Sequence, residues 1–277
     1  MRIPDLPFLA FLTGLVAVVG SVYAGPIRPE SEKGIPSLDV PRAIAPPVID
    51  GRLDEKAWKE AATITGLLPA RGEDTAARIA RIPTTVRVLW DPGSLYVSFE
   101  CVDDEVWSTG SARPRDQIYL EDVCEVFLDG VGDGRQYLEV QSSPAGRNFD
   151  VLYLFTRSPA YTPQMRMTEE FCRTDRWKFP GWEVKGVRTA GRKLIRGDKV
   201  IGWAVEMAIP AGPVMKRRGS EVFFPTEIRG NFVRYDWPLS PATGKRELLQ
   251  MNWSPVLLGC PHISPSRMGR LNLVEFP

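Results

Sequence analysis

Two acidic residues stand inside segments whose other residues are mostly apolar. Glu125 lies in VCEVFLD (123–129), and Glu139 lies in YLEVQ (137–141). Side chains of an extended strand alternate between its two faces, so each glutamate shares a face with the residues two positions before and after it. These neighbours are Val123, Phe127, Tyr137 and Gln141. If the two faces belong to one sheet, two carboxylates, an amide and a phenol converge on one patch.

Paired carboxylates support three kinds of chemistry. They can act as the acid and base of a glycosidase, accept hydrogen bonds from sugar hydroxyls, or bind a metal ion. Two structural alternatives compete with these uses: a buried acid pair neutralised by arginine, or a polar face open to solvent. The two glutamates by themselves leave all of these interpretations open.

The chain has a single histidine, His262, in the segment CPHISPSRMGRL (260–271). One imidazole cannot form a histidine-rich metal site, and no GxSxG motif supplies the activated serine of a Ser-His-Asp hydrolase. A hydrolase built on histidine is therefore disfavoured. Without further information, a lone histidine in a proline-rich loop is a surface or turn residue.

Aspartates gather at turns in the first half of the chain: Asp91, Asp103, Asp104, Asp116, Asp122 and Asp129. Carboxylates in loops suit calcium, although no twelve-residue EF-hand loop is present, and solvated turn acids are the alternative. The candidate calcium ligands are Asp91, Asp103 and Asp122.

Aromatic residues are abundant, with 8 tryptophans and 7 tyrosines that could stack on sugar rings. Trp90 and Trp203 fall within strand-like segments and are expected in the core. The better candidates for a sugar platform lie in loops or at strand ends: Trp107, Tyr119 and Trp253.

The N-terminal segment 1–24 has one arginine, an apolar run and small residues at its end, which is typical of a cleaved export signal. An uncleaved membrane anchor is the alternative, and only then would the chain meet a membrane. Residues 25–46 contain six prolines and predict an extended leader, so the domain is expected over 47–277. Export predicts a secreted or periplasmic protein.

Charge and cysteine content exclude other classes. Lys+Arg 35 against Asp+Glu 34 gives a net charge of +1, which does not favour nucleic acid as a partner. The four cysteines are not spaced as CxxC, so a zinc site on cysteines is not expected. Their pairing stays open among Cys101, Cys124, Cys172 and Cys260.

Short apolar runs separated by turn residues predict an all-β fold. Strands are expected at 84–90, 95–102, 123–129, 135–141, 149–155, 181–189, 199–210, 223–237, 247–253 and 269–276. One short helix is expected in IDGRLDEKAWKEA (49–61), capped by Asp50 or Asp54. Strands without intervening long helices favour a single-domain β-sandwich or jelly roll.

Several motifs occur in the order typical of one family. PVIDGRLDEKAWKEA, VRVLWDPGSLYVSFECVDDEV, LEDVCEVFLDG, YLEVQSSPAG, GWAVEMAIP, GNFVRYD and WSPVLLGCPHISPSRMGRLNLVE follow one another along the chain. Together they resemble family 9 carbohydrate-binding modules, and more closely the exported stand-alone proteins called carbohydrate-binding family 9-like. The resemblance runs from about Pro47 to Phe276.

The resemblance implies a jelly-roll sandwich related to DOMON-like domains, which binds oligo- or polysaccharide without catalysis and is supported by calcium. The acidic residue of the D-x-x-E-x-F strand falls on Glu125, and the loop aromatic falls on Tyr119. That aromatic is typically tryptophan, and the second tryptophan of the sugar sandwich has no counterpart near His262. The stand-alone proteins have a histidine before P-x-x-x-G, as this chain does. The resemblance thus implies a site lined by Tyr119, Glu125, Glu139, Gln141, Arg234, Trp253, His262 and Arg267.

Three functions follow from these residues. The first is non-catalytic carbohydrate binding that supports polysaccharide recognition or breakdown, with glycoside hydrolases as partners and no organic cofactor. The second is a glycoside hydrolase that uses Glu125 and Glu139. The third is a DOMON-like electron-transfer domain with haem held by His262 and Met251 or Met268.

Overall fold

The computed structural model describes residues 34–70, 75–112, 114–155, 176–179 and 182–275. The expected signal segment and Cys172 lie outside these ranges. No helix within the described ranges is long and apolar enough to cross a membrane.

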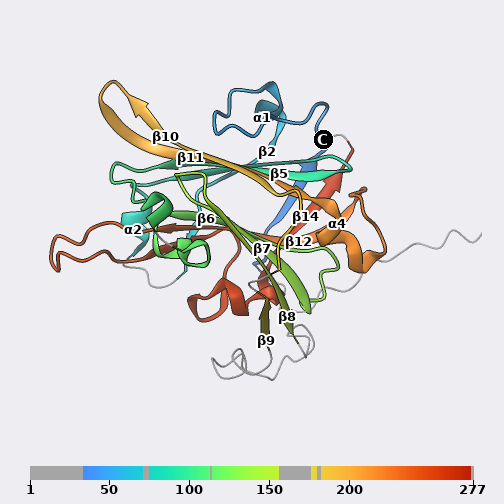
Figure 1. The fold of residues 1–277 in the computed structure, drawn as a ribbon. Coiled ribbons are helices and arrows are strands. Elements are labelled where there is room, and N and C mark those ends of the chain that lie inside the picture. The colour runs from blue at the N-terminus through green and yellow to red at the C-terminus, as the bar shows by residue number, and fades with distance from the viewer. Residues whose placement is uncertain (1–33, 71–74, 113, 156–175, 180–181, 276–277) are drawn as a thin grey trace, which may run out of the picture.

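Two sheets stack face to face in the described part of the chain, as Figure 1 shows. The larger sheet has the order β1 (Ser37–Pro41), β14 (Gly269–Val274), β12 (Thr226–Asp236), β6 (Val123–Asp129), β7 (Gln136–Ser142), β8 (Asn148–Phe155) and β9 (Arg176–Phe179), with β13 (Leu249–Asn252) and β3 (Leu68–Pro69) attached through β12. The smaller sheet has the order β10 (Arg188–Arg196), β11 (Lys199–Pro210), β5 (Ser94–Val102), β4 (Thr84–Trp90) and β2 (Ala62–Thr65). The predicted all-β sandwich is confirmed.

Helices are short and lie outside the sheets. The α-helices described are α1 (Lys56–Glu60), α2 (Ala76–Ile79) and α4 (Ala211–Met215). The 3₁₀ turns described are η3 (Gly110–Ala112), η4 (Arg115–Leu120), η6 (Lys216–Arg218), η7 (Leu257–Gly259), η8 (Pro261–Ile263) and η9 (Pro265–Arg267). The last three are consecutive along the chain, coloured orange-red in Figure 1, and hold the segment around His262.

Most predicted strands match the structure within two residues, because their alternation of apolar and polar residues is unambiguous. The strand expected at 223–237 begins later, as β12 at Thr226. The segment 181–189 differs most, since β10 begins only at Arg188. A turn precedes it, in which the amide of Val187 donates to the carbonyl of Val184 and Gly186 has a φ of 88°. The apolar residues of this turn pack against the core without forming a strand.

The expected leader at 25–46 contains a strand of the sandwich. β1 (Ser37–Pro41) pairs in parallel with β14, and Val40 is fully buried in the core. The prolines do not prevent this, because Pro36 lies before the strand and Pro41 ends it at the sheet edge. The folded domain therefore starts before residue 47, and this corrects the predicted boundary.

The larger sheet is buried on both faces. Cys124, Val126 and Leu128 of β6 point into the core between the sheets. Val123 and Phe127 point to the opposite side, where they join a second apolar cluster with residues of β7, β8, β12 and the C-terminal turns. We call this side of the larger sheet the outer face. Glu125, which alternates with Cys124 and Val126, belongs to it.

The smaller sheet also buries a glutamate on its outer side. Glu206 of β11 accepts hydrogen bonds from the amides of Asp50 (2.8 Å) and Gly51 (2.6 Å) and from the Trp58 indole N–H (2.7 Å). These bonds fasten α1 and its preceding turn to the sheet. The predicted helix is confirmed, but the predicted cap is wrong: Glu55 occupies the N-cap without a side-chain bond, and Asp50 accepts from the Arg52 amide instead.

Candidate functional site

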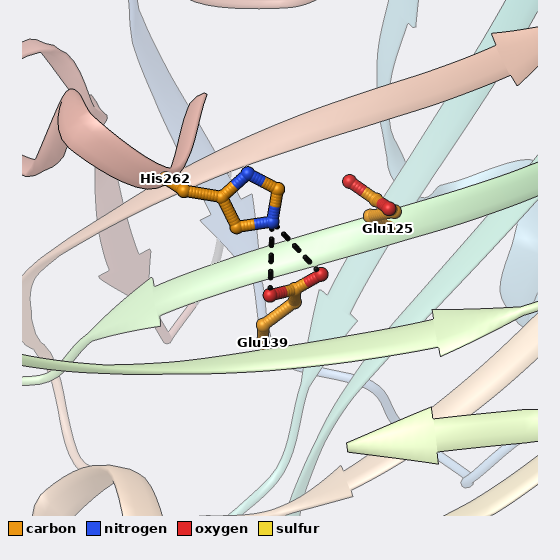
Figure 2. Close-up of side chains that lie close together, drawn as sticks. All are labelled: Glu125, Glu139 and His262. Carbon is orange, nitrogen blue, oxygen red and sulfur yellow. Dashed lines mark hydrogen bonds and ion pairs between the residues drawn. The ribbon is translucent and has the colours of Figure 1, made fainter. Parts of the chain in front are cut away.

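Glu125, Glu139 and His262 converge on the outer face of the larger sheet. Glu125 comes from β6 and Glu139 from the adjacent β7, whereas His262 lies in η8 and reaches down onto the strands. One ligand atom of each lies within 4.8 Å of the others, and Figure 2 shows the side chains facing one another. The prediction that the two glutamates share one sheet face is confirmed.

The strand register explains this convergence. Glu125 pairs with Gln141, and Phe127 pairs with Glu139, so the two carboxylates are diagonal neighbours on one face. Gln141 donates a hydrogen bond from its amide to Glu139 Oε1. The predicted patch of two acids and an amide is therefore present, although all three side chains are buried.

His262 forms an ion pair with Glu139 and is the member of the cluster that reaches solvent. Its Nε2 lies 3.2 Å from Glu139 Oε2 and 3.4 Å from Oε1, and 21% of the side chain is exposed. Nδ1, on the other side of the ring, lies 3.9 Å from the Cys260 sulfur. His262 is thus not the surface residue expected of a lone histidine in a loop.

Aromatic rings hold the imidazole in place. The rings of Phe127 and Tyr153 lie 5.3 Å and 5.7 Å from that of His262. The Tyr137 hydroxyl donates to the His262 carbonyl at 2.7 Å, and the Tyr137 ring stacks on Tyr153 at 4.8 Å. The position of the histidine is fixed both through its backbone and through its ring.

The environment separates the protonation states of the two glutamates. Burial raises the pKa of Glu125 well above its ordinary value, and the negative charge of Glu139 raises it further. Burial acts in the same direction on Glu139, but the charge and hydrogen bond of His262 outweigh it and lower the pKa of that carboxyl. At neutral pH the cluster contains a neutral Glu125 and an ionised Glu139.

His262 is protonated in this environment. Burial by itself would lower its pKa, but the charge of Glu139 and the contact with Cys260 raise the pKa to about 10. The cluster then carries one positive and one negative charge, together with a neutral acid.

Glu125 is the member of the cluster without a partner. Neither of its carboxyl oxygens has a hydrogen-bond partner among the described residues, although the side chain is fully buried. Buried polar groups are almost always satisfied, since an unmade hydrogen bond costs about 1–3 kcal/mol. The fold therefore leaves the carboxyl oxygens of Glu125 available to a ligand.

Arg234 does not belong to this cluster. It pairs with Cys124 in the register of β6 and β12, so it points into the core between the sheets. Its guanidinium contacts Asp236 at 2.6 Å and Asp103 at 3.5 Å, and it donates to the carbonyls of Ile82 and Val102 at 3.1 Å. The expectation that Arg234 lines the site, or meets Glu125, is wrong because the residue lies on the other face of the sheet.

Trp253 is also a core residue. Its ring lies 5.4 Å from that of Phe232 and packs against the backbone of Gly269, where an added Cβ would come within 2.2 Å of the indole. Only 9% of Trp253 is exposed. The prediction of a sugar platform at this position is corrected, since the close approach of Gly269 leaves the ring no free face there.

Other predicted residues lie nearer the surface. Tyr119 lies in the last turn of η4 with 39% of its surface exposed, and its carbonyl accepts from the Trp237 indole N–H at 3.1 Å. The Trp107 ring is covered by the Arg246 guanidinium at 4.0 Å from its centroid. Arg267 ends η9, and its carbonyl accepts a hydrogen bond from the Ser254 hydroxyl. Tyr119 is therefore the exposed aromatic among the predicted platforms.

The three predicted calcium ligands do not come together. Asp91 lies before β5 and Asp103 after it, so they are at opposite ends of that strand. Asp91 accepts from the amides of Gly93 and Ser94 and from the Tyr96 hydroxyl, each at 2.8 Å, and is satisfied by its own turn.

Asp103 and Asp122 instead join Asp236, with ligand atoms within 4.8 Å of one another. Arg234 already neutralises two of these acids, and Asp122 accepts from the amides of Trp107 and Trp237. Burial raises the pKa of Asp103 to about 6 and that of Asp122 to about 8. Calcium binding stays a prediction, and this cluster does not fit it because its charge is balanced by arginine and by protons.

The haem alternative loses one of its proposed ligands. Met251 is packed in the core between the sheets, whereas His262 and Met268 lie with the outer-face cluster. His262 Nε2, the nitrogen turned away from Cys260, faces Glu139. The pair of His262 and Met251 cannot hold one haem, because the larger sheet separates them.

Sequence reasoning missed three residues that complete the cluster: Tyr153, Tyr235 and Cys260. Tyr235 pairs with Val123 in the register of β12 and β6 and belongs to the apolar cluster of the outer face. Burial raises its pKa well above the ordinary value, and the charges of Glu125 and Glu139 raise it further. For Tyr153, the alternation of FDVLYLF contained the signal, since it puts this ring on the face of Val151 and Phe155. Cys260 had no signal in the sequence beyond its position next to Pro261.

Comparison with known proteins identifies this fold and its strands. Residues 49–166 match the family model described as carbohydrate family 9 binding domain-like. The matched region contains β6 and β7 with both glutamates, whereas His262 comes from beyond it. No curated protein sequence matches the chain.

Solved structures with the same fold include carbohydrate-binding proteins. A family 9 carbohydrate-binding module from Caldicellulosiruptor kristjanssonii, in complex with cellotriose, has 17% identity and a TM-score of 0.54, covering 86% of this chain and 95% of that one. A module of the same family and organism in complex with glucose gives 16% identity and a TM-score of 0.51, covering 86% and 97%.

A protein from Bacteroides uniformis, whose structure is described as that of a putative carbohydrate-binding protein, has 14% identity and a TM-score of 0.61. The match covers 87% of this chain and 100% of that chain. The family match over residues 49–166 and the shared sandwich confirm the resemblance of this chain to family 9 carbohydrate-binding modules.

Proposed function

We propose that the protein binds carbohydrate without acting on it, at the outer face of the larger sheet around Glu125, Glu139, Gln141 and His262. The observation that carries this proposal is the convergence of these four side chains on strands that match a carbohydrate-binding family. A sheet that buries polar groups beside aromatic rings combines the two features that recognise a sugar: hydrogen-bonding groups of fixed orientation and apolar surface.

The sugar approaches from the side of His262 and Tyr119, the exposed members of the predicted site. The imidazolium donates to a sugar oxygen, and the carboxyl of Glu125 supplies the unpaired oxygens for hydroxyl groups. Tyr119 offers a single aromatic face, so the contact differs from a sandwich between two tryptophans. This site favours specificity through charge-assisted hydrogen bonds over stacking.

Export and a role in polysaccharide breakdown belong to the same proposal. The N-terminal sequence 1–24 supports secretion or a periplasmic location, where extracellular sugars would be met. Glycoside hydrolases are the expected partners of a binding protein without catalysis. Comparing the mass of the protein recovered outside the cytoplasm with that of the full chain tests the cleavage after Ala24.

A glycan array followed by calorimetric titration tests the central part of the proposal. Glucose and cellotriose are the first ligands to titrate, because related structures contain them. Saturable binding that weakens in Glu125→Gln supports the proposal. Absence of binding to any glycan, reducing-end sugars included, would overturn it.

One observation favours a second candidate, a retaining glycoside hydrolase. The two carboxylates are close and their pKa values are shifted apart, with Glu125 as the neutral acid and Glu139 as the ionised nucleophile. Against this, Glu139 is buried and already engaged by His262 and Gln141. Release of a fluorescent aglycone from aryl glycosides, lost in Glu139→Gln, would establish the hydrolase and displace the binding proposal.

A further inference from the structure

The three converging side chains also form a set of metal ligands. Two carboxylates and one imidazole approach one another from two neighbouring strands and a loop, with a ligand atom of each within 4.8 Å of the others. Because the three ligands come from different elements, they can surround an ion from several sides, which successive acids in a single turn cannot do. Figure 2 shows the carboxyl of Glu125 and that of Glu139 turned toward the same imidazole.

The unsatisfied oxygens of Glu125 are separate evidence for a bound ion. Its side chain is fully buried, it faces the cluster, and neither oxygen has a hydrogen-bond partner among the described residues. Gln141 Oε1, next to it across the strand pair, is likewise buried without a partner there. The amide oxygen of Gln141 only accepts hydrogen bonds, and the carboxyl oxygens of Glu125 do the same once the group is ionised. A cation satisfies such oxygens when they face one another.

The imidazole is oriented for coordination. Nε2 points at the carboxylates, and Nδ1 is next to the Cys260 sulfur on the far side of the ring. Once the imidazolium loses its Nε2 proton to an incoming ion, the contact of Nδ1 with Cys260 favours the remaining proton on Nδ1, and Nε2 can bind the metal ion. The carbonyl of His262 is held by Tyr137, so the ring is positioned before any ion arrives.

We propose that Glu125, Glu139 and His262 bind a divalent metal ion that accepts both oxygen and nitrogen ligands, Zn²⁺ or Mn²⁺. The ion displaces one proton from Glu125 and one from His262 as it binds, and the resulting two carboxylates and neutral imidazole match its charge. The nitrogen ligand disfavours calcium and magnesium, which take oxygen ligands. Ligands at about 2.0–2.2 Å from an ion lie roughly 3–3.5 Å from one another. His262 and Glu139 meet this spacing at 3.2 Å, and Glu125 can rotate inward because no hydrogen bond restrains it.

Titration of untagged, chelator-treated protein with ZnCl₂ and with MnCl₂ tests the site. Calorimetry should show one ion per chain, and NMR should show the signals of His262 shifting with Zn²⁺ and broadening with Mn²⁺. The chain has 1 histidine, so these signals need no assignment. Glu125→Gln and His262→Asn should each weaken binding at least about tenfold.

A control variant tests whether ion binding depends on the three ligands. Glu100→Gln makes the same chemical change on an exposed strand residue paired with Arg87, and should leave binding unchanged. The site is refuted if no ion binds, if His262 signals do not respond in the wild-type protein, or if Ca²⁺ binds as tightly as Zn²⁺ and Mn²⁺.

The metal ion would be bound by three of the side chains assigned to the sugar site, but the two proposals can fail separately. Sugar binding is measured with chelator present and again with one equivalent of the ion. Ion binding without sugar binding supports the metal site and overturns the sugar proposal, whereas sugar binding without an ion does the reverse.

Discussion

Both sheets bury a glutamate on the side that faces away from the shared core, and the two side chains are treated differently. Glu206 on the smaller sheet accepts three hydrogen bonds from the turn and helix that cover it. Glu125 on the larger sheet has no partner for either oxygen among the described residues. Burial of an acid within a strand therefore does not identify a binding site. Its hydrogen bonds decide the matter: an acid whose oxygens are satisfied by the protein, such as Glu206, stabilises the fold, whereas one without partners, such as Glu125, is available to a ligand.

The core between the sheets gives a third case, with the largest expected effect. Arg234→Leu removes the cation that contacts Asp103 and Asp236 and leaves both acids buried. We expect the free energy of unfolding to fall by about 3–5 kcal/mol, measured by urea denaturation followed through tryptophan fluorescence. Arg87→Leu, which breaks the more exposed pair with Glu100, should cost under about 1 kcal/mol. Equal losses in the two variants would refute a structural role specific to Arg234.

Glu206→Gln tests whether the glutamate on the smaller sheet stabilises the fold through its hydrogen bonds. An amide must turn its NH₂ group toward either the Trp58 indole or the amides of Asp50 and Gly51, all of which are donors. The expected loss in the free energy of unfolding is about 1–3 kcal/mol. Sugar affinity of the folded fraction should stay at the wild-type value. A variant as stable as the wild type would contradict the assignment of Glu206 as a fastening.

Glu125→Gln is the matched change on the larger sheet. Burial keeps Glu125 neutral in the free protein, and glutamine has nearly the same shape and polarity as a neutral carboxyl group. Stability should therefore change by less than about 1 kcal/mol. Sugar affinity should fall about tenfold, or about 1.4 kcal/mol, because the amide replaces one of the two carboxyl oxygens by an NH₂ group that cannot accept a hydrogen bond from a sugar hydroxyl. Unfolding of the variant with normal affinity in the folded fraction would make Glu125 structural.

Asp133→Asn should have the smallest effect on the free energy of unfolding and serves as a reference for a more exposed ion pair. The pKa of Asp133 is lowered by the hydrogen bond from Arg217, which lies 2.5 Å away. The pair stabilises the fold above the ordinary pKa of Asp133, and this contribution is lost as the pH falls through the lowered value. Asp133→Asn should cost about 0.2–1 kcal/mol at pH 7 and nothing at a pH below the lowered pKa. A cost that persists in acid would show that the ion pair is not its origin.

The sequence predicted the strands well because their alternation decides both position and face. It gave the face of each glutamate within its own strand, and the pairing of β6 with β7 shows that the two faces are one. Arg234 could not be placed, because its face follows from pairing with Cys124 on a strand more than 100 residues earlier. Asp236 was missed for the same reason. Neither composition nor periodicity reports which distant strands are neighbours.

Loops were predictable only through family resemblance. His262 has no periodic pattern around it, and its approach to Glu139 depends on three consecutive 3₁₀ turns and on the bond from Tyr137. Trp253 was predicted at the end of a strand as a sugar platform, but Gly269 leaves space for its ring in the core. The glycine provides a physical signal for that burial, which becomes visible only when β14 and the segment after β13 are seen side by side.

The most direct test of the account follows the one histidine while sugar is added. Untagged wild-type protein is titrated, with chelator present, with the glycan that binds most tightly on the array, and the His262 ring signals are recorded by NMR. If the sugar binds at the outer face, these signals shift with the same midpoint as the calorimetric titration, since Nε2 lies within the proposed site at 3.2 Å from Glu139. Saturable sugar binding that leaves the His262 signals unchanged would contradict the account and place the sugar elsewhere on the protein.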